Sequence, residues 1–154
     1  MNKPNIFYYS KHRELWLYMA DRDTIKQIVN EVKESLEVRH SFSDIICEVE
    51  QEVKRTKTWY IRTKHDDFIN GSCYACDVSV KMDIDCADCP IKIGICDTDN
   101  DTEETDSLYH NYILAISNII YKNTNMDKAV QYAQQIAYAE LNKEAIEYYN
   151  IEVV

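Results

Sequence analysis

The sequence predicts a mainly α-helical protein, an α+β chain with little strand. Hydrophobic residues recur at three- and four-residue steps in both halves of the chain, which is the spacing of one helix face. The two glycines and one of the two prolines fall in a single central segment, so the rest of the chain carries few helix breakers. We expect one domain over residues 1–154, with a helical part over residues 1–64, a loop-rich insert over residues 65–106 that contains five of the six cysteines, and a helical hairpin with a tail over residues 107–154.

Two helices are expected at the start of the N-terminal part. Ser10 is a candidate N-cap for the first helix and Asp23 for the second, because short oxygen-bearing side chains accept hydrogen bonds from the first backbone amides of a helix. The apolar residues at helical spacing are Leu15, Trp16, Tyr18 and Met19 in the first helix, and Ile25, Ile28, Val29, Val32 and Leu36 in the second.

The segment 42–61 fits two patterns. Ile45, Val49 and Val53 fit one face of a helix, whereas Ile45, Cys47 and Val49 also fit the alternation of a strand. The last four residues of the segment are rich in strand formers. We expect a helix that runs into a short strand, with Cys47 acting as a small buried hydrophobic residue.

The C-terminal part predicts a helical hairpin. Apolar residues repeat at helical spacing over Leu108–Tyr121 and again over Met126–Leu141, and the turn Asn123–Asn125 separates the two runs. The tail 143–154 either extends the hairpin or finishes as a short strand over residues 151–154, and its pattern fits both.

The cysteines carry the strongest chemical signal in the chain. Four of the six form the spacing C-x2-C-x9-C-x2-C, in which Cys73 pairs with Cys76 and Cys86 pairs with Cys89. Two such knuckles supply the four thiolates that zinc prefers in tetrahedral coordination. We therefore expect one structural zinc ion, whose closed coordination leaves no position for a reactive water.

The cysteines also fit other interpretations. Ordinary buried thiols, an iron–sulfur cluster and a redox dithiol are the alternatives to zinc. If one of the four cysteines is not a ligand, Cys96 or His65 is the candidate replacement.

Acidic residues dominate the charge of the chain. Its 27 acidic and 17 basic side chains give a formal net charge of −10, so we expect the protein to repel a phosphate backbone. The acidic run 97–106 begins like a calcium loop, but Thr102 and Leu108 replace the glycine and the glutamate that such a loop needs. The run is either a solvated loop or a line of carboxylates presented to a basic partner. The candidate partner-binding residues are Asp97, Asp99, Asp101, Glu103, Glu104 and Asp106.

One basic segment, residues 54–64, interleaves five cations with aromatic residues, a pattern that single-strand nucleic-acid binders use. The alternative is a strand whose cations pair with nearby carboxylates and whose aromatic side chains pack inward.

Several motifs carry a resemblance to a known group of proteins. They are Trp16, the knuckles Cys73-Tyr-Ala-Cys76-Asp77 and Cys86-Ala-Asp-Cys89-Pro90, the later Cys96, and the helical motifs Tyr109-His-Asn-Tyr112 and Ala129-Val-Gln-Tyr132-Ala133-Gln-Gln-Ile136-Ala137. Over roughly residues 70–141 the chain resembles small zinc-knuckle accessory proteins encoded by phages and prophages of Gram-positive bacteria. The resemblance implies a zinc-stabilised, mostly helical phage protein. Such accessory proteins include anti-CRISPR proteins, and this chain is similar in size and charge to an inhibitor of a type II effector nuclease.

The expected function is therefore binding rather than catalysis. The four histidines are scattered and no glycine-rich phosphate cradle is present, so we do not expect an enzyme. The longest apolar stretch is far shorter than the roughly 20 residues of a membrane span, and we expect a cytoplasmic protein. The expected partner is a host CRISPR effector nuclease, with no direct contact to nucleic acid. The alternative is a zinc-ribbon transcriptional regulator that contacts nucleic acid through residues 54–64.

Overall fold

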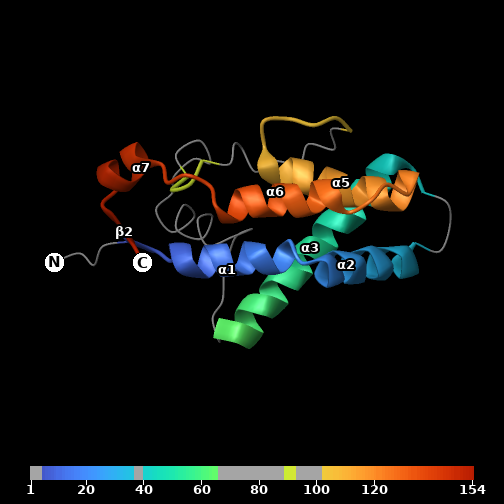
Figure 1. Ribbon diagram of the computed structural model, residues 1–154, viewed down its shortest axis with the longest axis horizontal. Helices are drawn as coiled ribbons and strands as arrows, with labels where there is room; N and C mark the ends of the chain where they lie inside the picture. The colour runs from blue at the N-terminus through green and yellow to red at the C-terminus, as the bar shows by residue number, and fades with distance from the viewer. Residues whose placement is uncertain (1–4, 37–39, 66–88, 93–101) are drawn as a thin grey trace.

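The computed structural model describes residues 5–36, 40–65, 89–92 and 102–154, and this part of the chain is mainly α-helical, as the sequence predicts (Figure 1). The helices are α1 (Tyr9–Met19), α2 (Arg22–Ser35), α3 (Phe42–His65), α5 (Leu108–Lys122), α6 (Asp127–Ala137) and α7 (Lys143–Tyr148). The strands are β1 (Asn5–Phe7) and β2 (Ile151–Val153). None of the described helices is both long and apolar enough to cross a bilayer.

Both N-terminal helices begin earlier than the sequence predicts. The amide of His12 donates to the carbonyl oxygen of Tyr8 (2.9 Å), so α1 already includes Ser10, which is not its cap. Asp21 rather than Asp23 caps α2, because its extended backbone places Oδ1 to accept from the amides of Asp23 (2.9 Å) and Thr24 (3.4 Å).

The helix α3 is continuous, and the short strand expected near its end is absent from this described segment. Val49, Val53, Lys57 and Ile61 are all buried and follow one another at four-residue steps. The face they form packs against α5 and α2, and this packing outweighs the strand propensity of residues 58–61.

The helical form of α3 also overturns the expectation for Cys47. Its side chain is exposed, whereas Ile46 and Val49 on either side are buried. Strand alternation would have placed Cys47 and Val49 on the same face, but in a helix a separation of two residues points them in different directions.

The C-terminal hairpin is present, with α5 and α6 side by side and antiparallel (Figure 1). Asn123 ends α5 in a left-handed conformation, which an asparagine tolerates well. The helix α6 ends before the predicted Leu141, because the chain leaves the helix to form an antiparallel bridge between Leu141 and Ile91.

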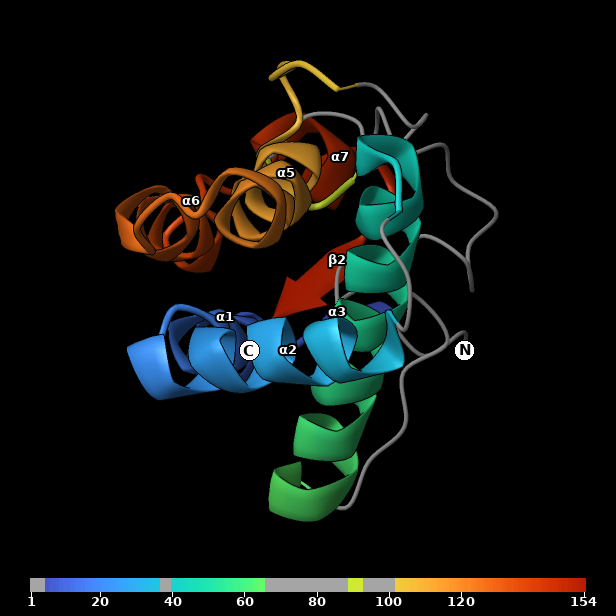
Figure 2. The ribbon, with the colours of Figure 1, turned by 90° about the vertical axis from the view of Figure 1, so that its right-hand side faces the viewer.

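The helix α5 lies at the centre of the fold. Every residue from Tyr109 to Ser117 is buried, because α5 packs against α6, α3 and α2. Figure 2 shows α5 with α6 above α1 with α2, and α3 running beside both layers. The Trp16 ring from α1 makes T-shaped contacts with the rings of Tyr109 and Tyr112, with centroids 6.0 and 5.5 Å apart.

The tail finishes as a short strand, one of the two alternatives that its pattern fits, and it does not extend the hairpin, because α6 ends at Ala137. It forms the short helix α7 and then the strand β2, which pairs in parallel with β1 in the register Asn5 to Ile151 and Phe7 to Val153. The strand β1 is not among the elements that the sequence pattern predicts. This pairing joins the two ends of the chain.

Candidate functional site

Most of the predicted zinc site lies outside the described residues. Cys73, Cys76 and Cys86 fall there, and so does Cys96. Cys89 is described and buried. Within the described ranges, no three His, Cys, Asp or Glu side chains are grouped to hold a metal ion.

The short segment that contains Cys89 is attached to the helical scaffold by its backbone. The amide of Asn142 donates to the carbonyl oxygen of Pro90 (2.7 Å), and the amide of Lys92 donates to that of Glu140 (2.9 Å). Ile91 between them is buried in the core. The end of the second cysteine knuckle is therefore held against the connection between α6 and α7.

His65, the candidate replacement ligand, lies at the end of α3. Its Nε2 is 3.3 Å from Oε2 of Glu14, and its ring lies against Tyr60 with centroids 6.0 Å apart. In the described part of the chain, His65 therefore contacts α1 and its own helix.

The acidic run is described from residue 102 onward, so Asp97, Asp99 and Asp101 fall outside it. The three remaining candidates, Glu103, Glu104 and Asp106, are exposed. We call residues 103–106 the acidic turn.

Hydrogen bonds fix the acidic turn to the first turn of α5. The backbone of Thr105 pairs twice with the side chain of Asn111, since its amide donates to Oδ1 and its carbonyl accepts from Nδ2, both at 2.9 Å. His110 Nε2 donates to the carbonyl oxygen of Glu103 (3.0 Å). Ser107 caps α5 by accepting from the amide of His110 (3.1 Å). The carboxylates of the turn therefore project from a fixed backbone.

Glu104 faces α6. Its Oε1 accepts from the hydroxyl of Tyr132 (2.7 Å) and from Nζ of Lys128 (3.2 Å). These two bonds lower the pKa of Glu104 below its ordinary value. Burial and the Glu104 carboxylate together raise the pKa of Tyr132 to about 12. Glu104 thus holds the turn against α6 as well as carrying charge.

Three of the five cations in the basic segment 54–64 contact other side chains of the protein. Lys54 lies 3.4 Å from Glu50, and Arg55 lies 2.7 Å from Glu52, each pair on the surface of α3. Lys57 is only 1% exposed, and its Nζ lies over the rings of Tyr109 and Trp16. The expectation that the cations pair with nearby carboxylates is confirmed for Lys54 and Arg55, on a helix instead of a strand.

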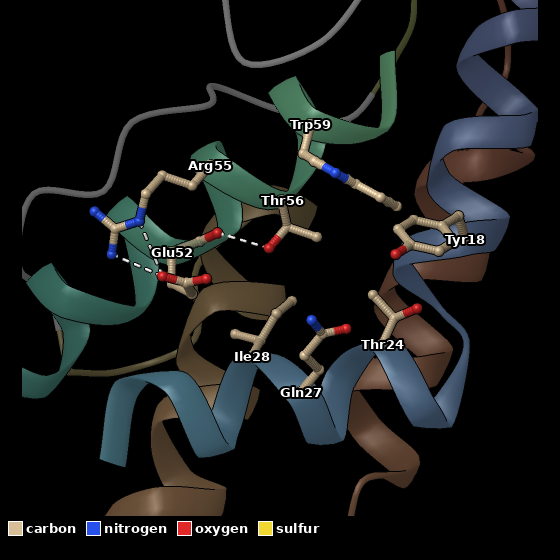
Figure 3. A pocket seen from close by; sticks show the side chains of 8 residues that line it. All are labelled: Tyr18, Thr24, Gln27, Ile28, Glu52, Arg55, Thr56 and Trp59. Atoms are coloured by element: carbon tan, nitrogen blue, oxygen red, sulfur yellow. Dashed lines mark hydrogen bonds and ion pairs between the residues drawn. The ribbon is translucent and has the colours of Figure 1, made fainter. Parts of the chain in front are cut away.

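A cleft between α2 and α3, which the sequence analysis did not predict, has a volume of about 240 Å³ (Figure 3). Trp59, at its rim, is 52% exposed, so the expectation that the aromatic residues of the basic segment pack inward is wrong for Trp59, whereas it is confirmed for Tyr60, which is buried. Glu52, Arg55 and Trp59 are spaced to lie on one face of a helix, and this spacing could have indicated the cleft. It indicates a shared face only if residues 42–65 form a single helix. The residues that line the cleft are Tyr18, Thr24, Gln27, Ile28, Glu52, Arg55, Thr56 and Trp59.

Comparisons with known proteins do not assign a function to this chain. The chain matches no protein-family model, no curated protein and no solved structure.

Proposed function

We propose that the protein is a non-catalytic inhibitor that binds a positively charged surface of a nucleic-acid-handling protein in a bacterial host. The specific target class is a type II CRISPR effector nuclease, in line with the resemblance to phage accessory proteins. Such nucleases hold nucleic acid in positively charged channels. An acidic protein of net charge −10 is attracted to the same surfaces.

The observation that carries the proposal is the acidic turn on its fixed backbone. Its carboxylates are exposed, while hydrogen bonds from Asn111, His110 and Tyr132 already hold the segment in place. A partner therefore does not have to order the turn on binding, which lowers the entropic cost of association.

The proposal includes one structural zinc ion. The ligands are Cys73, Cys76, Cys86 and Cys89, as the knuckle spacing indicates. Four thiolates and one divalent ion carry a net charge of about −2, which would add to the negative field of the acidic run. The backbone attachment of residues 89–92 gives the insert a fixed base on the scaffold.

The proposal also holds that the protein does not bind nucleic acid through the basic segment. Lys54 and Arg55 are paired with carboxylates, and Lys57 is buried. Only Arg62 and Lys64 of this segment are exposed cations outside such pairs in the described chain. This distribution favours a protein partner over the zinc-ribbon regulator.

The test measures cleavage by a purified type II effector nuclease in the presence of the protein. The double variant Glu103→Lys with Asp106→Lys should lower the association rate constant roughly tenfold, because electrostatic steering is lost. A second variant reverses Asp97, Asp99 and Asp101 and reports on the rest of the run. The matched control is Glu144→Lys with Glu147→Lys on α7, two exposed acids whose reversal changes the net charge equally.

Steep weakening of inhibition with rising salt would support the proposal, since screening limits the field to about 8 Å at physiological ionic strength. If both charge-reversed variants inhibit as well as the parent, the acidic run is not the interface. Tight binding of oligonucleotides by the parent at physiological salt would favour the zinc-ribbon regulator.

A further inference from the structure

We propose that the cleft between α2 and α3 binds an arginine side chain of a protein partner. This assignment rests on the proposed function only in assuming that the partner has a basic surface. The cleft is smaller than the roughly 300–1,000 Å³ of sites for drug-sized ligands, and its volume of about 240 Å³ suits a single side chain.

Aromatic and aliphatic groups form one part of the cleft. Trp59 from α3 and Tyr18 from α1 approach each other at one end, with ring centroids 6.3 Å apart (Figure 3). Ile28 and Thr24 from α2 also line the cleft, and both are buried. The aliphatic stem of an arginine packs on surfaces of this kind, and its charged head is attracted to the face of an aromatic ring.

Hydrogen-bond acceptors lie further along the cleft. Arg55 donates twice to Glu52, through Nε (2.9 Å) and through a terminal nitrogen (2.7 Å), and both bonds end on Oε2. In the described chain no donor reaches Oε1 of Glu52 or the side-chain amide of Gln27, and both residues line the cleft. The cleft therefore offers two acceptor oxygens from two different helices.

A guanidinium matches these acceptors better than an ammonium does. It carries five N–H donors in a rigid plane, so a single guanidinium has donors enough for both Glu52 Oε1 and the side-chain oxygen of Gln27. The Glu52 carboxylate would then lie between two guanidinium groups, its own Arg55 and that of the partner. A lysine ammonium is a compact point charge without this planar fork.

The dimensions of the cleft are consistent with an extended side chain. Glu52 and Trp59 are seven residues apart on one face of α3, which is two helical turns or roughly 10 Å. Thr56 lies between them, and its hydroxyl donates to the backbone carbonyl oxygen of Glu52 (2.9 Å). The Thr56 hydroxyl proton is thus used within the helix and does not compete for the Glu52 carboxylate.

Substitution of Arg55 can show whether the ligand of the cleft is cationic or anionic. Its side chain is 59% exposed and lies at the end of the cleft away from Tyr18, whereas that of Glu52 is 17% exposed (Figure 3). A cationic ligand is repelled by Arg55, so removing that charge should strengthen binding. An anionic ligand would need Arg55, so the same substitution would weaken binding.

The experiment uses the intrinsic fluorescence of the full-length protein. The chain has two tryptophans, and because Trp16 is buried, a change in emission on adding a ligand reports mainly on Trp59. The probes are the capped peptide Gly-Gly-Arg-Gly-Gly, its lysine counterpart and inorganic phosphate. We expect a saturable response to the arginine peptide and a weaker affinity for the lysine peptide.

Substitutions of the residues that line the cleft test the expected contacts with the arginine peptide. Glu52→Gln should weaken binding of the arginine peptide about tenfold, which corresponds to one lost charge-assisted hydrogen bond. Arg55→Gln should strengthen it. The matched control is Glu50→Gln, because Glu50 loses the same charge on the same helix and does not line the cleft. Gln27→Ala provides a second test in the event that Glu52→Gln alters the folding of α3, which thermal melts would reveal.

Equal affinity for the arginine and lysine peptides, or the absence of a saturable response, would overturn the inference. Weaker binding by Arg55→Gln together with a response to phosphate would assign the cleft to an anion instead. The inference and the proposed function can also fail separately. Peptide binding by a protein that does not inhibit the nuclease refutes only the function, and inhibition without peptide binding refutes only the inference.

Discussion

Lys57 Nζ lies 3.3 Å from the phenolic oxygen of Tyr109 and 4.4 Å from the centroid of its ring, so a cation of α3 is packed against the central helix α5. The Trp16 ring approaches the same ammonium at 5.3 Å. Such cation–π contacts are strongest where water is excluded. A residue that the sequence placed among potential nucleic-acid contacts therefore helps to join three helices.

Substitution of Lys57 tests this structural role. Lys57→Ala should lower the free energy of unfolding by about 2–4 kcal/mol, because a buried side chain and its contacts are lost. Lys64→Ala removes the same charge from an exposed position of the same helix and should change stability by no more than about 0.5 kcal/mol. Chemical denaturation measures both values. Equal stability of the two variants would show that Lys57 does not join these helices.

His12 predicts a dependence of stability on pH. Its Nε2 donates to the carbonyl oxygen of Ile136 (2.8 Å), and burial, aided by the charges of Arg13 and Lys57, lowers the pKa of His12 from 6.5 to about 4. Between these two values the unfolded chain binds a proton that the folded protein does not, so stability should fall as pH decreases from 6.5 towards 4.

The measurement is the free energy of unfolding against pH for the parent and for His12→Gln. The difference between the two proteins should change by up to about 1.4 kcal/mol per pH unit within this window and stay constant above pH 7. Parallel curves across the window would contradict a buried, neutral His12.

Metal analysis tests the zinc proposal directly. Protein purified without chelator should contain close to one zinc ion per chain. Cys76→Ser and Cys89→Ser should lose the ion and lower the melting temperature, because the metal would cross-link the two cysteine knuckles and its binding free energy would add to the stability of the fold. Cys47→Ser is the control, since Cys47 is exposed on α3 and should not affect zinc content. Metal-free protein from the same preparation would refute the site.

The packing of α6 can be tested at Ile136, which is fully buried. Ile136→Asp should be severely destabilising, by more than about 3 kcal/mol, because it buries a charge without a partner. Gln135→Asp places the same carboxylate at the neighbouring exposed position of α6 and should cost far less. Thermal unfolding followed by circular dichroism compares the two. If both variants melt alike, Ile136 does not face the core.

Local patterns in the sequence determined most of the helices. In α2 and α6, the apolar residues recur every three or four positions, and this spacing alone identifies the face that is buried. In α5 the same spacing identified the helix but not its burial, because α5 is surrounded by other helices and is buried on all sides from Tyr109 to Ser117. The charge and the cysteine spacing likewise depend on residue types alone. The zinc ligands and the acids of residues 97–101 remain predictions, because all but Cys89 lie outside the described residues.

Tertiary contacts decided the rest. Residues 58–61 have strand propensity, yet they are helical because Tyr60 and Ile61 are buried against neighbouring elements, and burial contributes more free energy than intrinsic propensity. The pairing of β1 with β2 joins opposite ends of the chain, so no local window contains both partners. The cleft arises only where α2 packs on α3, and the burial of Lys57 depends on α1 and α5 together. Local periodicity determined most of the helices of this protein, but only the packing of those helices decided which cations are buried and where the cleft lies.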